Sequence, residues 1–226
     1  MIVQTMTHEE VYEEMAKERE AVTTWWRSRL WEMRRAVLKS TKPFPLTKWV
    51  DYTSARRNRY LFYTCIFDKR MKKILTGTIV TRLMPDGLWA YAAWLGDQDL
   101  VTKTVLSPHA LKRYAERAHI NEQGTELIKH YFINNPYGCD TTNQQIIGKS
   151  VRYNGEEHSA TCIKEGVLLG QLYGDLYVAR TFITYEMATG MQKEEFEALR
   201  SRIMKIDIEM YHKTFEYYRA KRYAGM

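Results

Sequence analysis

The chain has 226 residues, 45% of them hydrophobic and 27% charged, with a formal net charge of +7 at pH 7. This balance is typical of a folded protein with one sizeable core or two small ones, and it excludes a largely disordered chain. The longest apolar run, residues 88–95, is far shorter than the ~20 residues that cross a bilayer, and no secretory leader is recognisable. Three scattered cysteines, Cys65, Cys139 and Cys162, do not form a disulfide framework. We therefore expect an unprocessed, soluble, cytoplasmic protein without membrane contact.

The positive charge is concentrated in one part of the chain. Residues 25–83 carry fifteen basic and three acidic side chains, whereas residues 1–24 carry two basic and six acidic ones. Aromatic residues interleave with this basic segment, a combination that can supply phosphate contacts and stacking surfaces for nucleic acid. A solvated surface has the same composition, so both interpretations stay open. The candidate nucleic-acid-binding residues are Arg56, Arg57, Arg59, Lys69, Arg70, Lys72 and Lys73.

A long amphipathic helix is predicted near the N-terminus. Thr7 and Glu10 have the spacing of a capping box, and apolar residues follow at helical steps as far as Val37. The helix should end near residue 39, before the stiff Lys-Pro-Phe-Pro segment at residues 42–45. Because a helix of about 30 residues spans about 45 Å, we expect part of it to pack on a partner chain or on a second long helix. The chain is therefore a candidate homo-oligomer.

Two β-meanders and a helix pair are predicted after residue 48. Runs rich in aromatic and β-branched residues indicate strands at 59–67, 73–83, 88–95 and 100–106, with turns at 68–70 and 85–87. Two helices are expected at 108–118 and 125–134, followed by strands at 159–164, 167–172 and 176–185. A second capping pair, Thr189 and Gln192, predicts a closing helix to about residue 222.

The predicted fold class is α+β, with antiparallel β-meanders and a central helix pair framed by long N- and C-terminal amphipathic helices. The pattern does not decide whether the two meanders form one sheet or two. The expected parts are a long helix (1–40), a basic antiparallel β-region (41–106), an α+β region (107–187) and a second long helix (188–226).

Residues 107–117 carry the most specific local pattern in the chain. Ser107 is a good N-cap and Pro108 a good first helical residue, so the start of this helix is well defined. At about 100° per residue, His109, Arg113 and Arg117 lie on one stripe, with apolar residues in another sector. A base beside two cations suits chemistry on phosphate, and it equally suits an ordinary solvated helix face.

Two helices followed by three antiparallel strands, with a histidine and arginines on the first helix, resemble the metal-independent ribonuclease superfamily that includes barnase and the RelE and ParE toxins. The resemblance covers residues 107–187, and the segment from Ser107 to Arg117 is similar to the helix opening of toxin-like domains in that group. It implies cleavage of RNA through the neighbouring 2′-hydroxyl, with one group taking its proton and cations stabilising the charged phosphorane. His109 would match the base, and Arg113 or Arg117 the cation.

The last predicted strand contains a charge in an apolar row. In an extended strand Leu176, Val178, Arg180, Phe182 and Thr184 share one face. Together with Thr181 and Thr184, Arg180 is a candidate phosphate-binding residue. The alternative is structural, because a buried charge needs a partner, and three glutamates are available for it: Glu156, Glu165 and Glu186.

Other kinds of site have less support. Cys139, with His109 or His158, has the residue types of a nucleophile and its base, and His130, Cys139, His158 and Cys162 are zinc-ligand types without close pairing. The fingerprints of nucleotide, dinucleotide and zinc-hydrolase sites are absent from the sequence. We expect no metal and no cofactor. The leading hypothesis is a nucleic-acid-directed protein with an RNA-cleaving, toxin-like region, and the alternative is a non-catalytic structural or interaction protein that forms a helix-mediated homodimer.

Overall fold

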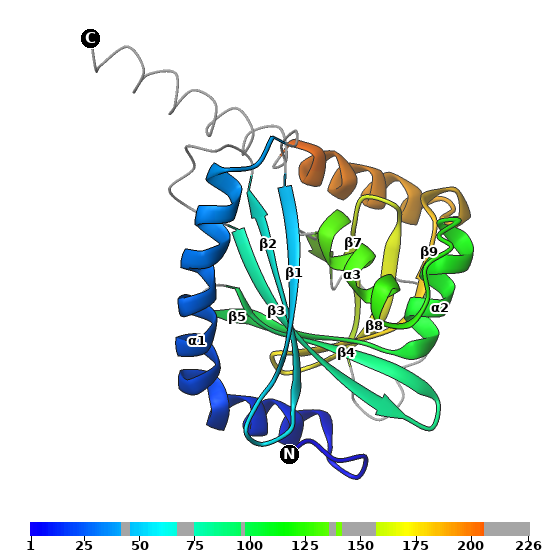
Figure 1. The fold of residues 1–226 in the computed structure, drawn as a ribbon. Helices are drawn as coiled ribbons and strands as arrows, with labels where there is room; N and C mark the ends of the chain where they lie inside the picture. Colours follow the sequence, from blue (N-terminus) through cyan, green and yellow to red (C-terminus); the bar gives the residue numbers. More distant parts are fainter. Residues whose placement is uncertain (42–45, 67–74, 96–97, 136–138, 142–156, 206–226) are drawn as a thin grey trace.

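The computed structural model describes residues 1–41, 46–66, 75–95, 98–135, 139–141 and 157–205. Within these residues nine strands form one mixed sheet, in the order β1-β2-β3-β4-β5-β9-β8-β7-β6 (Figure 1). The strands are β1 (Leu46–Thr53), β2 (Arg59–Ile66), β3 (Leu75–Met84), β4 (Gly87–Leu95), β5 (Gln98–Leu106), β6 (Cys139–Thr141), β7 (Glu157–Cys162), β8 (Val167–Tyr173) and β9 (Leu176–Ile183).

The sheet consists of two antiparallel meanders joined by one parallel pairing. β1 to β5 pair with their chain neighbours, and so do β6 to β9. The junction is the parallel ladder between β5 and β9, where Val105 lies opposite Val178 and Leu106 opposite Ala179. The two predicted meanders are therefore parts of one sheet, and the α+β fold class is confirmed.

Helix α1 (His8–Leu38) covers one face of the β1–β5 half. Its predicted capping box is present: the Glu10 amide donates to Thr7 Oγ1 over 3.2 Å, and the Thr7 amide donates to the Glu10 carboxylate over 2.7 Å. Apolar residues along one side of α1, from Val11 to Met33, are buried against aromatic residues of the strands. The long helix thus packs on the sheet of its own chain, and assembly with a second chain stays a prediction. No described helix has an apolar stretch that could span a membrane.

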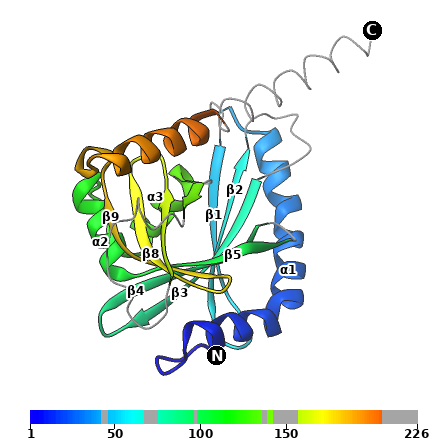
Figure 2. The same ribbon diagram turned by 180° about the vertical axis from the view of Figure 1, so that it is seen from behind.

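Helices α2 (Pro108–Arg117) and α3 (Gly124–Asn134) lie on the opposite face of the sheet (Figures 1 and 2). Ser107 Oγ accepts the Ala110 amide over 3.1 Å, so the predicted N-cap is confirmed. The Tyr114 ring is fully buried and packs edge-on against Tyr131 and Phe182, with centroids 5.3 and 5.2 Å apart. These aromatic contacts fix the helix pair to the sheet.

A helix over residues 191–205 covers the other end of the face that α1 occupies. It follows the short 3-10 helix η1 (Tyr185–Met187), and its buried residues Phe196, Leu199 and Ile203 pack over Cys162 of β7 and Val167 of β8. The closing helix was predicted to reach about residue 222, and residues 206–226 lie outside the described residues.

The predicted strands after residue 59 match the observed ones to within a few residues, and the turn before Gly87 is confirmed. The predicted turn at 68–70 falls outside the described residues. Neither edge strand of the described sheet, β1 or β6, was predicted.

A β-bulge in β9 contradicts the predicted row of side chains in that strand. Ala179 pairs with Gly170 and Thr181 pairs with Leu169, so Arg180 is an extra residue between two regular parts of the ladder. The extra residue reverses the alternation beyond it. Val178 consequently faces the α1 side, whereas Phe182 points into the core beneath α2.

Candidate active site

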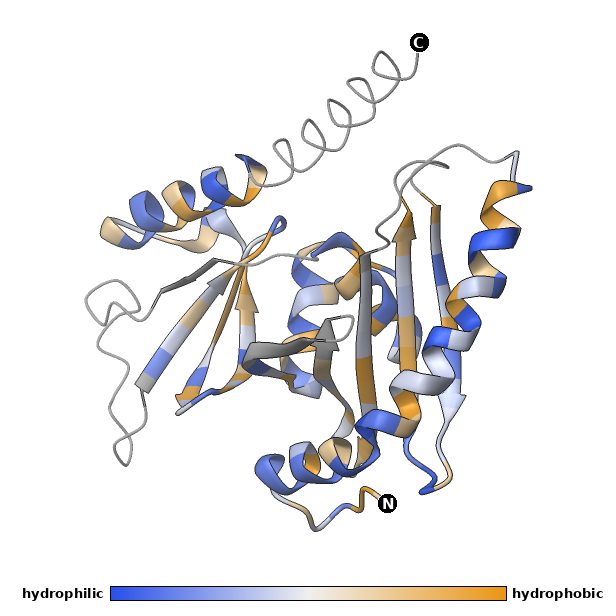
Figure 3. Ribbon diagram, turned by 90° about the vertical axis from the view of Figure 1, so that its left-hand side faces the viewer, coloured by the Kyte–Doolittle hydropathy of each residue, from blue (hydrophilic) through white to orange (hydrophobic). Residues whose placement is uncertain are grey.

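A polar strip separates two apolar clusters on the sheet face that carries α1. Strand β8 shows the order: Val167 and Leu169 belong to the cluster under residues 191–205, Tyr173 packs against the cluster under α1, and Gln171 lies between them. Figure 3 shows this face from the α1 side, with α1 and the helix over residues 191–205 at different ends of the sheet. We call His8, His158, Gln171 and Arg180 the histidine–arginine strip.

Arg180 is held on this face by Gln171. Its Nε donates to Gln171 Oε1 over 3.1 Å, and the Tyr173 hydroxyl donates to the same oxygen over 3.0 Å. The Arg180 side chain is exposed. The bulge explains this position, because the extra residue is not needed for the ladder and its side chain can project from the sheet.

His158 lies directly across from Gln171, on the neighbouring strand β7. The two residues are register partners, and paired residues on one sheet face have Cβ atoms about 4.5–5.5 Å apart. Ala160 and Cys162, on the same side of β7, lie under the helix over residues 191–205, which confirms the face to which His158 belongs. The imidazole is half-buried beside the residue that holds Arg180.

His8, the first residue of α1, completes the strip from a distant part of the chain. Its ring packs on Trp89 and Tyr91, with centroids 5.1 and 5.8 Å away. Burial lowers the pKa of His8, and the positive charge of Arg180 lowers it further, with Glu9 acting in the opposite direction. His8 and Arg180 therefore interact electrostatically although they lie near opposite ends of the sequence.

A second guanidinium lies beneath His8. Arg82 is only 6% exposed, and it donates to the Tyr91 hydroxyl over 3.2 Å and to the Met6 carbonyl over 2.9 Å. Among the described residues, neither Arg82 nor Arg180 has a carboxylate within ion-pair distance, in contrast to Arg56, Arg59 and Arg113. Among the described residues, the strip and Arg82 beneath it therefore combine two imidazoles with two guanidinium groups that have no carboxylate partner.

The structure does not bring the predicted α2 stripe together with Arg180. His109 is exposed in the first turn of α2, the Arg113 guanidinium pairs with Glu116 at 2.9 Å, and Arg117 donates to the Phe182 carbonyl. These residues lie on the α2 side of the sheet, whereas the Arg180 side chain lies on the α1 side. The structural alternative predicted that Arg180 pairs with a glutamate. Its described partner is Gln171, and Glu156 lies outside the described residues.

The two candidate threonines take different positions. Thr181 is in β9 opposite Leu169, on the side of the helix over residues 191–205. Thr184 follows the strand and is the N-cap residue of η1. Neither makes a described contact with Arg180.

Most of the described candidate nucleic-acid residues already have acidic partners. Arg56 donates to the buried Glu14 carboxylate over 2.6 and 2.8 Å, and Arg59 pairs with Asp51 at 2.6 Å. Arg57 is exposed in the turn between β1 and β2, with a φ of 61°. The other four candidates, Lys69, Arg70, Lys72 and Lys73, lie outside the described residues.

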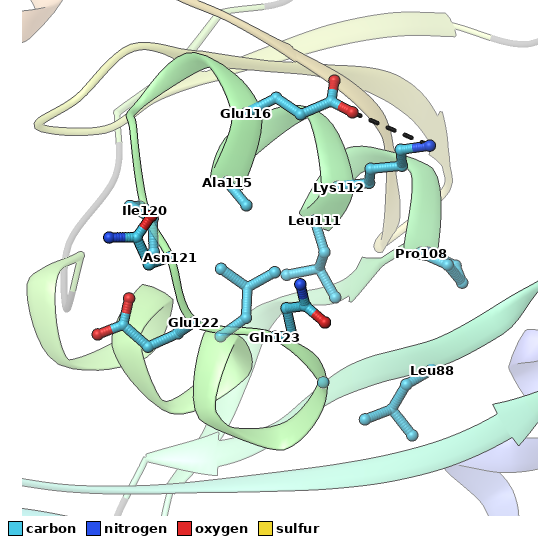
Figure 4. A pocket seen from close by; sticks show the side chains of 12 residues that line it. Leu88, Pro108, Leu111, Lys112, Ala115, Glu116, Ile120, Asn121, Glu122 and Gln123 are labelled. Atoms are coloured by element: carbon cyan, nitrogen blue, oxygen red, sulfur yellow. Dashed lines mark ion pairs between the residues drawn. The ribbon is translucent and has the colours of Figure 1, made fainter.

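A separate pocket of about 510 Å³ lies between α2 and α3, and Figure 4 shows its lining. Its floor is apolar, with Leu88, Leu111 and Leu127, and the Lys112–Glu116 ion pair of 3.9 Å lies at its rim. None of His109, Arg113 and Arg117 lines it. The pocket therefore does not support the predicted base and cations.

The zinc-type residues lie apart where the structure describes them. Cys162 is buried under the helix over residues 191–205, while His130 lies on α3, 3.6 Å from the Glu122 carboxylate. Within the described ranges, no three His, Cys, Asp or Glu side chains form a group that could hold a metal ion. Side-chain positions are not described for Cys139.

Two of the four residues of the histidine–arginine strip, His158 and Gln171, could have been found from the sequence. His158 interrupts the apolar set of β7 in the same way as Gln171 interrupts that of β8, and both interruptions fall on one face. His8, Arg82 and Tyr91 carried no such signal. Comparison of the chain with protein-family models, with curated proteins and with solved structures returned no match.

Proposed function

We propose that the protein cleaves RNA at the histidine–arginine strip. The observation that carries this proposal is the placement of two imidazoles beside a guanidinium that has no described carboxylate partner. Cleavage through the 2′-hydroxyl needs a proton acceptor, a proton donor and a cation for the charge that develops on the phosphorus-bound oxygens. His8 and His158 are of the acid–base type, and Arg180 is of the cation type.

The reaction balances with these groups alone. One imidazole takes the 2′-hydroxyl proton as the 2′-oxygen bonds to phosphorus. The bond from phosphorus to the 5′-oxygen breaks, and the same imidazole, now protonated, returns its proton to this oxygen. The products are a 2′,3′-cyclic phosphate and a free 5′-hydroxyl. Arg180 would stabilise the pentacovalent intermediate through charge-assisted hydrogen bonds.

Two further features support a phosphate-containing substrate. A phosphodiester anion would supply the negative charge that Arg82 and Arg180 lack among the described residues. The order α2, α3, β7, β8 and β9 is that of two helices followed by three antiparallel strands, the pattern from which the resemblance to the barnase and RelE superfamily was drawn, with the additional short strand β6 between α3 and β7. The sequence-based hypothesis used His109 of α2 as the base, whereas this proposal places the reaction on the opposite face of the sheet, at the histidine–arginine strip.

RNA cleavage by variants of both faces tests the proposal. A labelled single-stranded RNA containing all dinucleotides is incubated with the wild type, Arg180→Gln and His158→Gln. We expect about 10²–10³-fold slower cleavage for Arg180→Gln and about 10²–10⁴-fold for His158→Gln. Circular dichroism verifies that each variant is folded.

Arg113→Gln and His109→Ala are the matched controls, because both change exposed or half-exposed residues of α2. They should cleave at the wild-type rate. Loss of cleavage in His109→Ala with full activity in Arg180→Gln would assign the reaction to α2 instead. A folded wild type that cleaves none of the RNA would refute the proposed function.

A further inference from the structure

The hydrogen-bond network beneath His8 determines which of its ring nitrogens carries a proton. Three groups take part: Arg82 from β3, Tyr91 from β4 and His8 from α1. Tyr91 is fully buried and Arg82 nearly so, hence water does not compete for their hydrogen bonds. Each donor and acceptor in this network can therefore be assigned from the described contacts.

A guanidinium can only donate, so Arg82 Nη1 gives a hydrogen to the Tyr91 oxygen over 3.2 Å. The phenolic hydrogen of Tyr91 then needs an acceptor of its own. His8 Nδ1 lies 3.1 Å from the Tyr91 oxygen and is the only further partner described for it. If Nδ1 carried a hydrogen, the buried phenolic hydrogen would have no acceptor among the described contacts, which is unfavourable. Nδ1 is therefore the acceptor.

We infer that Tyr91 and Arg82 are positioning residues that hold His8 as a neutral imidazole with its hydrogen on Nε2. This inference rests on the proposed function and assigns the roles within that site. A ring with this tautomer has no free lone pair, because Nδ1 accepts from Tyr91 and Nε2 is protonated. His8 thus donates a hydrogen bond to the bound phosphate from Nε2, and the proton acceptor for the 2′-hydroxyl is His158.

The charges around His8 agree with this assignment. Arg180 from β9 and Arg82 from β3 both lower its pKa in addition to burial, and Glu9, its neighbour on α1, raises it. Burial raises the pKa of Tyr91, so the phenol keeps the hydrogen that it donates. His8 is consequently neutral at pH 7, and the phosphate receives donors from a neutral imidazole and a charged guanidinium.

Nuclear magnetic resonance tests the tautomer without any substrate. Long-range ¹H–¹⁵N correlation spectra of the labelled protein are recorded at pH 7.5, and His8 is assigned by the peaks that disappear in His8→Asn. We expect the pattern of one neutral tautomer with the hydrogen on Nε2. A pattern with the hydrogen on Nδ1, or that of a charged ring, would overturn the inference even if the protein cleaves RNA.

Tyr91→Phe removes the phenolic hydrogen and keeps the ring. The His8 pattern should then shift toward a mixture of tautomers, and an unchanged pattern would contradict the role of Tyr91. Tyr12→Phe is the matched control, since the hydroxyl of this neighbouring buried tyrosine donates to the Ala92 and Thr104 carbonyls and makes no described hydrogen bond to the His8 ring. It should leave the pattern unchanged. Should Tyr91→Phe fail to fold, the wild-type spectrum still decides the tautomer.

Cleavage by conservative variants separates a hydrogen-bond donor from a base. In His8→Gln the amide nitrogen can donate from a position similar to Nε2, so cleavage should fall less than about tenfold, whereas His8→Ala should lose the ~10²–10³-fold typical of a missing donor. Equal losses in both variants would refute the donor role. An inactive wild type with the expected tautomer would instead refute the proposed function and leave the network assignment valid.

Discussion

Deleting Arg180 removes a whole residue from a central strand, and we expect the fold to tolerate it. The ladder on either side of Arg180 is regular, with Ala179 opposite Gly170 and Thr181 opposite Leu169. Without Arg180 these pairs become consecutive, and the alternation of Val178, Ala179 and Thr181 between the two faces is restored. The deletion therefore moves no neighbouring side chain to the wrong face.

The expected effect on stability is small, because Arg180 takes part in few described interactions. Its described hydrogen bonds are the one to Gln171 and a weak 3.5 Å hydrogen bond from Ser107 Oγ to the Arg180 carbonyl. Each contributes about 1 kcal/mol or less, and the unpaired extra residue is removed at the same time. A change of about 1 kcal/mol shifts Tm by roughly 2–4 °C in a protein of this size. Phosphate affinity should fall much more, by ~10–100-fold, since a charge-assisted hydrogen bond contributes about 1.5–3 kcal/mol.

Thermal unfolding followed by circular dichroism, together with RNA cleavage, measures both effects. The matched control deletes Leu168 from the regular strand β8, where it pairs with Thr161 and Phe182. That deletion shifts the register on both sides and should abolish cooperative unfolding. If deletion of Arg180 is as damaging as deletion of Leu168, Arg180 is not an extra residue. If the deleted protein folds and cleaves RNA at the wild-type rate, Arg180 is not the cation.

Three further predictions concern stability. The Arg56 guanidinium, followed by the Met1 ammonium, lowers the pKa of Glu14 from 4.5 to about 2, so this carboxylate stabilises the fold fully above pH 4.5 and the stabilisation is lost as the pH falls toward 2. Because Arg56 is half-exposed and solvent screens the ion pair, acid titration should show a loss of only about 1 kcal/mol in the free energy of unfolding. This loss should be absent in Glu14→Gln. Ser107→Ala removes the N-cap acceptor of the Ala110 amide and should cost about 1 kcal/mol in urea unfolding; an unchanged midpoint would show that the cap does not contribute. Phe196→Ala empties a fully buried position under the helix over residues 191–205 and should cost about 3–5 kcal/mol, a value that an exposed control such as Arg200→Ala should not approach.

The elements with local signals were predictable from the sequence. The capping box of Thr7 and Glu10 and the N-cap Ser107 both act within one helical turn, so the residues that define them are neighbours in the chain. Strand β1 was missed because its burial is only partial along its whole length, which leaves a weak alternation. The elements that were predicted correctly are therefore those defined by contacts between residues that are close in the sequence.

The candidate site depends on contacts that no local pattern reveals. His8 and Arg180 come close enough for the charge of Arg180 to lower the pKa of His8 because β5 pairs in parallel with β9, a long-range pairing that the propensities of either strand do not specify. The side-chain direction of Arg180 depends on a one-residue bulge, whereas sequence alternation assumes a regular strand. The ion pair of Arg113 on α2 could have been expected from the sequence, because Glu116 is three residues from Arg113 and such pairs are common on exposed helices.

The parallel ladder between β5 and β9 also determines when the strip is complete during synthesis. Residues 103–106 pair with residues 176–179, so the β1–β5 half, with α1 and His8, leaves the ribosome long before its partner strand. Domains fold from the N-terminus as the chain emerges, and in this chain the guanidinium and the second imidazole arrive only with β7 and β9. A truncated or stalled nascent chain that ends before β7 thus contains His8, Arg82 and Tyr91 without the groups opposite, and under the proposed function it would be inert toward RNA until the last strand is in place.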